Sequence, residues 1–151
     1  GFNTGIPEYG IHHLLWPHEI AERMEPFLGG AIDCMLVDGM DYVIEGEAMR
    51  PRWVADLIGK HPDDVRAVFV GYTDIDVDEK VALVKEHAAG ETDWLTSESD
   101  DYIRDHIGNM IAYSKTIKAE CEQCGLSYFD TSDDFSGAIA AATEALVVGR
   151  E

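Results

Sequence analysis

The chain has 151 residues, of which 46% are hydrophobic and 27% are charged, so it is long enough to bury a core within one domain. Its net charge of −19 repels nucleic acid and anionic membranes, and we expect neither as a partner. No apolar run reaches the ~18 residues that span a bilayer, and no basic, apolar leader opens the sequence. We therefore expect a cytoplasmic protein.

The first half of the chain reads as helix, strand, helix. Residues 1–15 are rich in glycine and are expected to form an irregular lead-in. Apolar residues at helical spacing predict a helix that begins at Pro17 and ends by Gly39. The segment Tyr42–Glu45 is typical of a short buried strand, and Pro51 then begins a second helix.

The second half contains the strongest strand signal. Val65–Tyr72 holds a nearly continuous apolar run, which is typical of a strand covered on both faces, as in a parallel sheet. The aspartates around Asp76 lack the glycine and glutamate of a calcium loop, so we expect them to cap the next helix. The remaining elements are expected in the order helix 76–89, loop 91–97, helix 98–124, strand 127–130, loop 131–133 and helix 134–148.

The alternation of strands and helices predicts an α/β fold with a mostly parallel sheet and helices on both faces. We assign residues 1–151 to a single domain of this fold. In such sheets, ligand sites lie beyond the carboxyl ends of the strands. Three loops meet this condition: Glu45–Arg52, Tyr72–Asp76 and Thr131–Asp133.

Glu45 ends the expected strand, directly after Val43-Ile44, and Arg50 and Arg52 flank Pro51 a few residues later. A carboxylate at a strand end can associate with a metal ion or accept a proton. The two arginines can each bind a phosphate or a carboxylate through paired hydrogen bonds. The alternative is that all three are surface residues, with the arginines paired to neighbours such as Glu47.

Cys121 and Cys124 form a CxxC sequence, which by itself is a weak signal for a metal or redox site. Steps of four and three residues from Ile103 place both thiols on the apolar stripe of the expected helix 98–124. We therefore interpret them as small core residues, and a zinc-binding role is the less favoured alternative. An odd total of three cysteines also argues against a disulfide scaffold.

The segment Val43-Ile44-Glu45-Gly46, with Pro51 shortly after it, resembles the third strand and acidic turn of P-loop small-molecule kinases. This group includes adenylate kinase-like and 2-phosphoglycerate kinase-like proteins. Val68–Tyr72 resembles the fourth strand of the family, and Tyr128–Ser132 resembles the fifth strand and its loop, near which such proteins hold the nucleotide base. Glu91–Trp94, together with the long helix that follows, is similar to the lid region of the family.

The resemblance implies a nucleotide-dependent phosphotransferase that acts on a small metabolite with ATP and Mg²⁺, within a five-stranded parallel sheet. Phosphoryl transfer relies on positioning and charge stabilisation, which suits the residues at the matching positions. The implied site comprises Glu45 as the catalytic and indirect Mg²⁺-associated carboxylate, Arg50 and Arg52 as catalytic arginines, Arg104 as a substrate contact, and Thr131 and Ser132 as nucleotide contacts.

The family's phosphate loop, G-x-x-x-x-G-K-[ST], is absent from the 151 residues. The first strand of the family and this loop would precede Gly1, and the lack of an initiator methionine agrees with such a missing segment. We therefore expect an N-terminally incomplete P-loop kinase-like fold that binds ATP and Mg²⁺ only together with that segment. The alternative function is a non-catalytic acidic α/β module that binds a basic partner protein.

Overall fold

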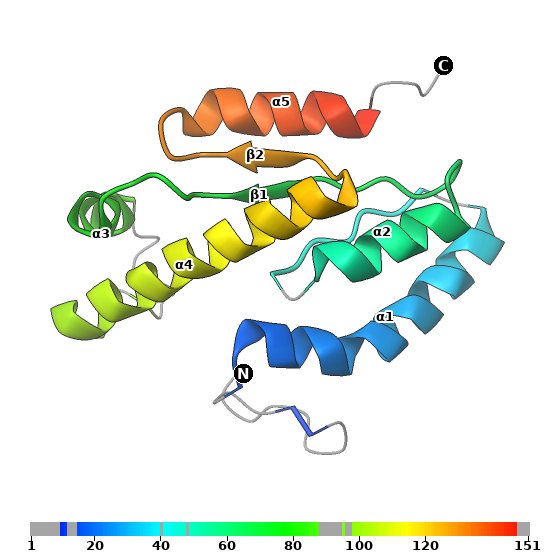
Figure 1. Cartoon of the computed structure of the whole chain (residues 1–151), viewed down its shortest axis with the longest axis horizontal. Coiled ribbons are helices and arrows are strands. Elements are labelled where there is room, and N and C mark those ends of the chain that lie inside the picture. Colours follow the sequence, from blue (N-terminus) through cyan, green and yellow to red (C-terminus); the bar gives the residue numbers. More distant parts are fainter. Residues whose placement is uncertain are drawn as a thin grey trace. The chain divides into compact units, whose positions relative to one another are not determined.

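The computed structural model describes residues 10–11, 15–39, 41–47, 49–87, 95 and 98–147. The chain divides into two compact units, Gly1–Arg66 and Ala67–Glu151, which Figure 1 shows in colours that follow the sequence. Most of the expected lead-in 1–15 and the lid-like segment Glu91–Trp94 lie outside the described residues. None of the described helices has both the length and the apolar character that a membrane crossing requires.

The first unit contains helices α1 (Pro17–Asp38) and α2 (Pro51–Lys60). The helix expected from Pro17 is confirmed. Its first turn is closed by Glu19, whose carboxylate accepts a hydrogen bond from the backbone N–H of Trp16 at 3.0 Å. At its other end Gly39 takes a left-handed conformation with φ 64°, which glycine adopts without a steric penalty.

The prediction of a strand at Tyr42–Glu45 is wrong. These residues belong to no helix or sheet, and Val43 is 93% exposed. The short apolar segment Val43-Ile44 suggested a buried strand, but a strand needs a partner for its backbone hydrogen bonds, and no described segment pairs with it. The first of the three expected strands is therefore a connector between α1 and α2.

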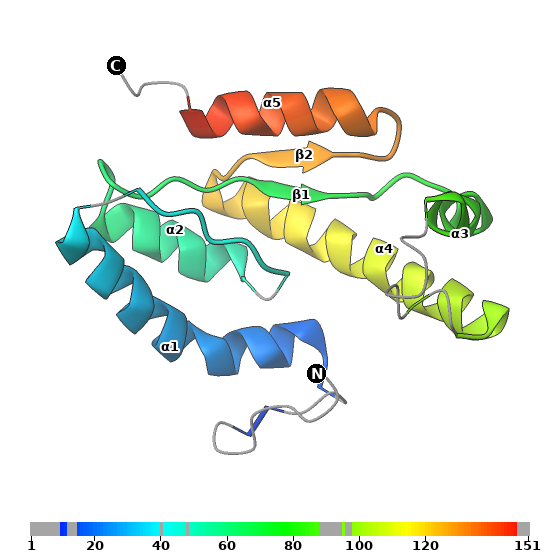
Figure 2. The ribbon, with the colours of Figure 1, turned by 180° about the vertical axis from the view of Figure 1, so that it is seen from behind.

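The second unit contains the sheet, which consists of β1 (Phe69–Gly71) and β2 (Tyr128–Asp130). The two strands are parallel, with Gly71 opposite Asp130. Parallel neighbours require a long crossover, and here it contains α3 (Val77–Glu86) and α4 (Asp100–Cys124). Helix α5 (Phe135–Val147) follows β2, and Figures 1 and 2 show α4 and α5 packing along the strand pair.

This architecture overturns the expected fold class. Helix accounts for 65% of the described residues, and the sheet has two strands rather than being the dominant layer. The segment Val65–Val68 is apolar apart from Arg66, but only Phe69–Gly71 of the expected strand Val65–Tyr72 pairs with β2. The described chain is thus a mostly helical protein with a small parallel strand pair, not a mostly parallel sheet with helices on both faces.

The core of the second unit lies between α3 and α4. Ile103, Ile107 and Ile111 form one buried stripe on α4, against which Val77, Val81 and Val84 of α3 pack. The stripe continues to Cys121, whose side chain is fully buried, as the helical spacing predicts. Burial raises the pKa of the Cys121 thiol to about 12, which keeps it protonated at neutral pH.

Candidate functional site

The candidate site is built around Asp130, the last residue of β2. Its Oδ1 accepts hydrogen bonds from the Ser132 hydroxyl at 2.6 Å and the Ser132 backbone N–H at 3.1 Å. The backbone N–H of Thr73 donates to the same oxygen at 3.3 Å. Its Oδ2 accepts from the Thr73 hydroxyl and from the Lys118 ammonium, the latter at 3.2 Å. One carboxylate therefore joins the ends of both strands to α4.

Two hydroxyl groups complete this connection. The Ser132 hydroxyl oxygen accepts hydrogen bonds from the backbone N–H groups of Thr73 and Asp74, at 3.0 and 2.9 Å. The Thr131 hydroxyl donates to the carbonyl of Gly71 at 3.1 Å, and the Thr131 backbone N–H donates to the same oxygen at 2.8 Å. The turn after β1 and the turn after β2 are thus held together at the carboxyl end of the strand pair.

The hydrogen bonds decide the protonation state of Asp130. Burial on its own raises the pKa of this carboxyl group, but the hydrogen bonds donated by Ser132 and Thr73 outweigh burial and hold the pKa well below its usual range. A carboxylate that accepts several hydrogen bonds is stabilised in its charged form. Asp130 is therefore a permanent anion at neutral pH, and it fixes the ammonium group of Lys118 as its counter-charge.

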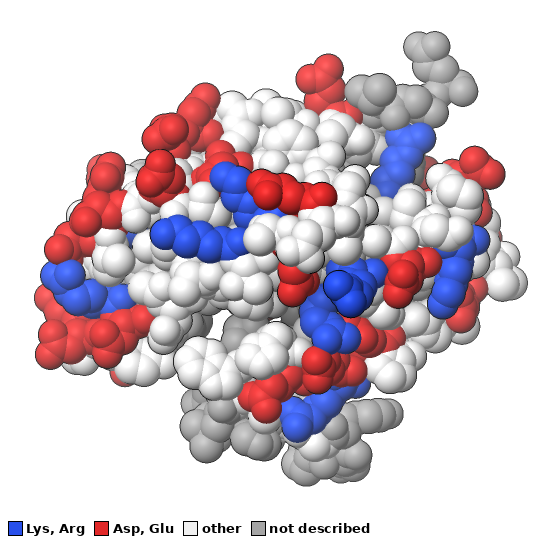
Figure 3. Space-filling view, viewed as in Figure 1, with Lys and Arg blue, Asp and Glu red and all other residues white. Residues whose placement is uncertain are grey.

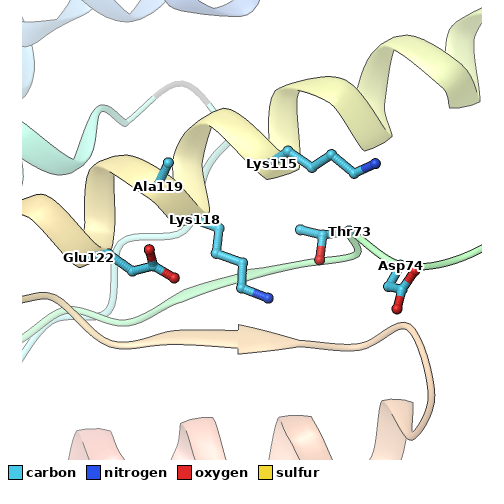
Figure 4. A pocket seen from close by; sticks show the side chains of 6 residues that line it. All are labelled: Thr73, Asp74, Lys115, Lys118, Ala119 and Glu122. Carbon is cyan, nitrogen blue, oxygen red and sulfur yellow. The ribbon is translucent and has the colours of Figure 1, made fainter.

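A depression of about 450 Å³ opens beside this network, between the turn after β1 and one face of α4. Figure 4 shows Lys118 and Glu122 reaching from α4 toward the strands, while Lys115 extends toward the Thr73–Asp74 turn. In the described part of the chain, Lys115 makes no ion pair or hydrogen bond. The residues that line the depression are Thr73, Asp74, Lys115, Lys118, Ala119 and Glu122.

The residues that the sequence analysis selected in the second unit do not all lie at the depression. Thr131 and Ser132 lie at the carboxyl end of the strand pair, but both hydroxyls are engaged in holding the two turns together. Arg104 does not line the depression. It lies nearer the start of α4 and forms an ion pair with Asp78 of α3.

In the first unit, Arg50 is committed to an internal cluster. Its guanidinium donates two hydrogen bonds to Glu25, from Nε at 2.6 Å and from Nη2 at 2.8 Å, and its Nη1 donates to Glu22 at 2.6 Å. This cluster fastens α1 to the residue that precedes α2. Glu45 and Arg52 are exposed, and neither makes an ion pair with any other described residue.

The sequence analysis missed the residues that supply the central hydrogen bonds and the positive charge of the site, namely Asp130, Thr73, Lys115 and Lys118. Two of them had a usable signal, because Asp130 ends the expected strand 127–130 and Thr73 lies in one of the three selected loops. The lysines had a weaker signal, a pair three residues apart on a helix, which places them on one side. Among the described residues, no group of three His, Cys, Asp or Glu side chains is arranged to hold a metal ion.

Comparison of the chain with protein-family models, with curated proteins and with solved structures found no match. The resemblance to P-loop small-molecule kinases therefore rests on the sequence motifs alone.

Proposed function

We propose that this chain takes part in nucleotide-dependent phosphoryl transfer to a small metabolite, with ATP as donor and Mg²⁺ as the accompanying ion. One observation carries the proposal: Asp130 and Ser132 hold the turns after two parallel strands together beside a depression bordered by two lysines. Ligands of parallel α/β units bind beyond the carboxyl ends of the strands. Lysine is a common point charge for phosphate groups.

In this proposal, Thr131 and Ser132 act by shaping the turn, because their hydroxyls are already bonded within it. The backbone of that turn then forms the surface for the nucleotide. No phosphate loop occurs in the 151 residues, and the proposal assigns the triphosphate to groups other than those that line the depression. Glu45 remains the carboxylate that is proposed to associate with Mg²⁺.

In the first unit, taken by itself, the proposal keeps roles for Glu45, Arg50 and Arg52. Glu45 and Arg52 are exposed and carry no competing ion pair among the described residues, which supports a role for both toward a ligand. Arg50 has its guanidinium on Glu22 and Glu25, which supports a positioning role at the start of α2 instead. Arg104, in its ion pair with Asp78, is proposed as a substrate contact only if that exposed pair opens.

Thermal unfolding of the full chain with and without Mg²⁺·ATP tests the proposal. We expect a higher Tm with Mg²⁺·ATP, because a ligand that binds the native state alone stabilises it. Ser132→Ala should reduce this rise, whereas Ser136→Ala, an exposed serine on α5, should leave it unchanged. Transfer of labelled phosphate from ATP to a mixture of small metabolites is the direct assay. No rise in Tm and no labelled product would overturn the proposal.

A specific observation favours a second candidate, an acidic module that binds a basic partner protein. Figure 3 shows acidic side chains gathered over α3 and the start of α4. The exposed members include Asp78, Glu79, Asp100, Asp101 and Asp105. Salt-sensitive binding of a lysine-rich peptide, in a protein that Mg²⁺·ATP does not stabilise, would favour this function over phosphoryl transfer.

Either function agrees with a cytoplasmic location, which we also propose.

A further inference from the structure

We infer that the depression beside Thr73 is a binding site for a small metabolite that carries one phosphate group and several hydroxyl or amino groups. The inference deepens the proposed function, and it rests on that function for the ligand class. The depression measures about 450 Å³, a size typical of pockets that take small molecules.

The positive charges of the depression stand out in this chain. The sequence has 11 Lys and Arg residues against 30 Asp and Glu residues, yet Lys115 and Lys118 border the same depression. Elsewhere in the second unit, Lys80 lies over the Tyr72 ring at 4.2 Å and Lys85 pairs with Asp100 at 2.5 Å. The pair on α4 thus brings two positive charges together in an acidic protein, on the same depression as the carboxylates of Asp74 and Glu122.

The two lysines have different states. Lys118 is held by Asp130 at 3.2 Å, and its side chain is 41% exposed. An ammonium group has three donors, so this contact leaves donors for a ligand while it limits the motion of the side chain. Lys115 has no such partner among the described residues. Lys118 is therefore a pre-positioned anion contact, and Lys115 closes on the same anion from the turn side.

Two carboxylates restrict which anion fits. Asp74 and Glu122 line the same depression, and carboxylates accept hydrogen bonds from hydroxyl and amino groups but repel further negative charge. A ligand with a single phosphate and several donors satisfies both sets of side chains, whereas inorganic phosphate satisfies only the lysines. The methyl group of Ala119 leaves this space open.

Titration of the full chain with glycerol 2-phosphate, followed by ¹H–¹⁵N NMR, tests the inference in the absence of nucleotide. We expect saturable shifts at the amides of Thr73, Asp74 and Ala119. Lys115→Ala and Lys118→Ala should each weaken binding by about tenfold or more, as expected for the loss of a charge-assisted hydrogen bond. Ala119→Met should block binding without any change of charge. Lys60→Ala removes the same charge from α2 and should leave binding unchanged.

The comparison ligands are inorganic phosphate and glycerol. We expect both to bind more weakly than glycerol 2-phosphate, because each satisfies one half of the site. Equal binding of inorganic phosphate, absence of saturable shifts at the three amides, or undiminished binding by Lys115→Ala would each overturn the inference. If one of these results is found while Mg²⁺·ATP still raises the Tm, the metabolite site is rejected and the proposed function stands. If glycerol 2-phosphate binds as expected but Mg²⁺·ATP has no effect on the Tm, the proposed function is rejected and the metabolite site stands.

Discussion

The hydroxyl of Thr73 donates a hydrogen bond to the carboxylate of Asp130, although 57 positions separate the two residues in the sequence. The contact closes the carboxyl end of the β1–β2 pair, where the ladder itself stops at Gly71 and Asp130. A two-stranded sheet is marginal by its own hydrogen bonds. Side-chain hydrogen bonds at its end therefore supply part of the stabilisation that further strands would supply in a larger sheet.

Thr73→Val should destabilise the protein by about 1–3 kcal/mol, the range for a buried acceptor that loses its partner. The substitution keeps the β-branched shape and removes only the hydroxyl. Urea unfolding measures the loss. Thr116→Val is the matched control, because its exposed hydroxyl donates to Ala112 of the same helix at 3.2 Å. Equal losses of stability in the two variants would show that the Thr73–Asp130 hydrogen bond contributes no more than an exposed hydrogen bond within a helix.

The stability of the protein should depend on the charge of Asp130 in acid. The pKa of this carboxyl group is lower in the folded protein than its ordinary value of 3.8. Its stabilising contribution is therefore fully present above the ordinary value and is lost as pH falls toward the folded value. Asp130→Asn should be less stable than the native chain at pH 7, and the difference should shrink in acid. Urea unfolding at a series of pH values measures it, and a constant difference would contradict the prediction.

Gly71 should tolerate no larger side chain. A Cβ atom at this position would meet the hydroxyl of Tyr128 and would lie 2.9 Å from the Ser114 hydroxyl, so Gly71→Ala should cost about 1–3 kcal/mol through overpacking. Tyr128→Phe removes one of the two clashes and should recover part of the loss in the double variant. Thermal or urea unfolding of the four proteins forms the cycle.

Gly108→Ala is the control for that cycle. Gly108 lies within α4, and a Cβ atom there meets nothing within 4 Å, so alanine should stabilise the helix by up to about 1 kcal/mol. The two glycine substitutions are thus expected to have opposite signs. The same sign for both would mean that backbone freedom, rather than contact with Tyr128, decides the effect at Gly71.

The helices were predictable because their signals are local. Pro17 and Pro51 begin α1 and α2, Gly125 ends α4 with φ 70°, and Asp76 caps α3 by accepting from two backbone N–H groups. Each of these signals acts within a few residues of the helix end. Sheet pairing has no such local code. Both Tyr42–Glu45 and the stronger signal Val65–Tyr72 predicted strands, and among the described residues only part of the second segment pairs with another strand.

The site was predictable in location but not in detail. The loop after the expected strand 127–130 was selected because ligands bind beyond strand ends. The resemblance to P-loop small-molecule kinases gave Thr131 and Ser132 the nucleotide contacts there, whereas their hydroxyls hold the two turns together. The bonds that Asp130 forms with Thr73 and Lys118 span 57 and 12 positions, and no pattern of neighbouring residues encodes them. The same holds for Arg50, whose partners on α1 lie 25 and 28 positions away.

Replacing Arg50 and replacing Arg52 by alanine should have different effects on the stability of the protein. Arg50→Ala leaves Glu22 and Glu25 without their shared cation. Because the Arg50 side chain is 34% exposed, solvent screens these charges, and we expect a loss of about 1–2 kcal/mol. Arg52→Ala should leave the stability unchanged, since the side chain is exposed and has no described ion pair. Urea unfolding distinguishes them, and equal effects would contradict the internal role of Arg50.

The three cysteines should differ in reactivity toward a thiol reagent such as DTNB. The thiolate is the reactive form, and the pKa of Cys121 is raised to about 12 by burial and by the nearby Cys124 and glutamates. Cys34 is exposed on α1 and should react first in the native protein. Cys121 should react only after the protein unfolds, so its labelling rate in increasing urea should follow the unfolding transition. Fast native labelling of Cys121, measured by mass spectrometry against Cys34→Ser as the control variant, would show that this stretch of α4 opens far more easily than its buried stripe of isoleucines implies.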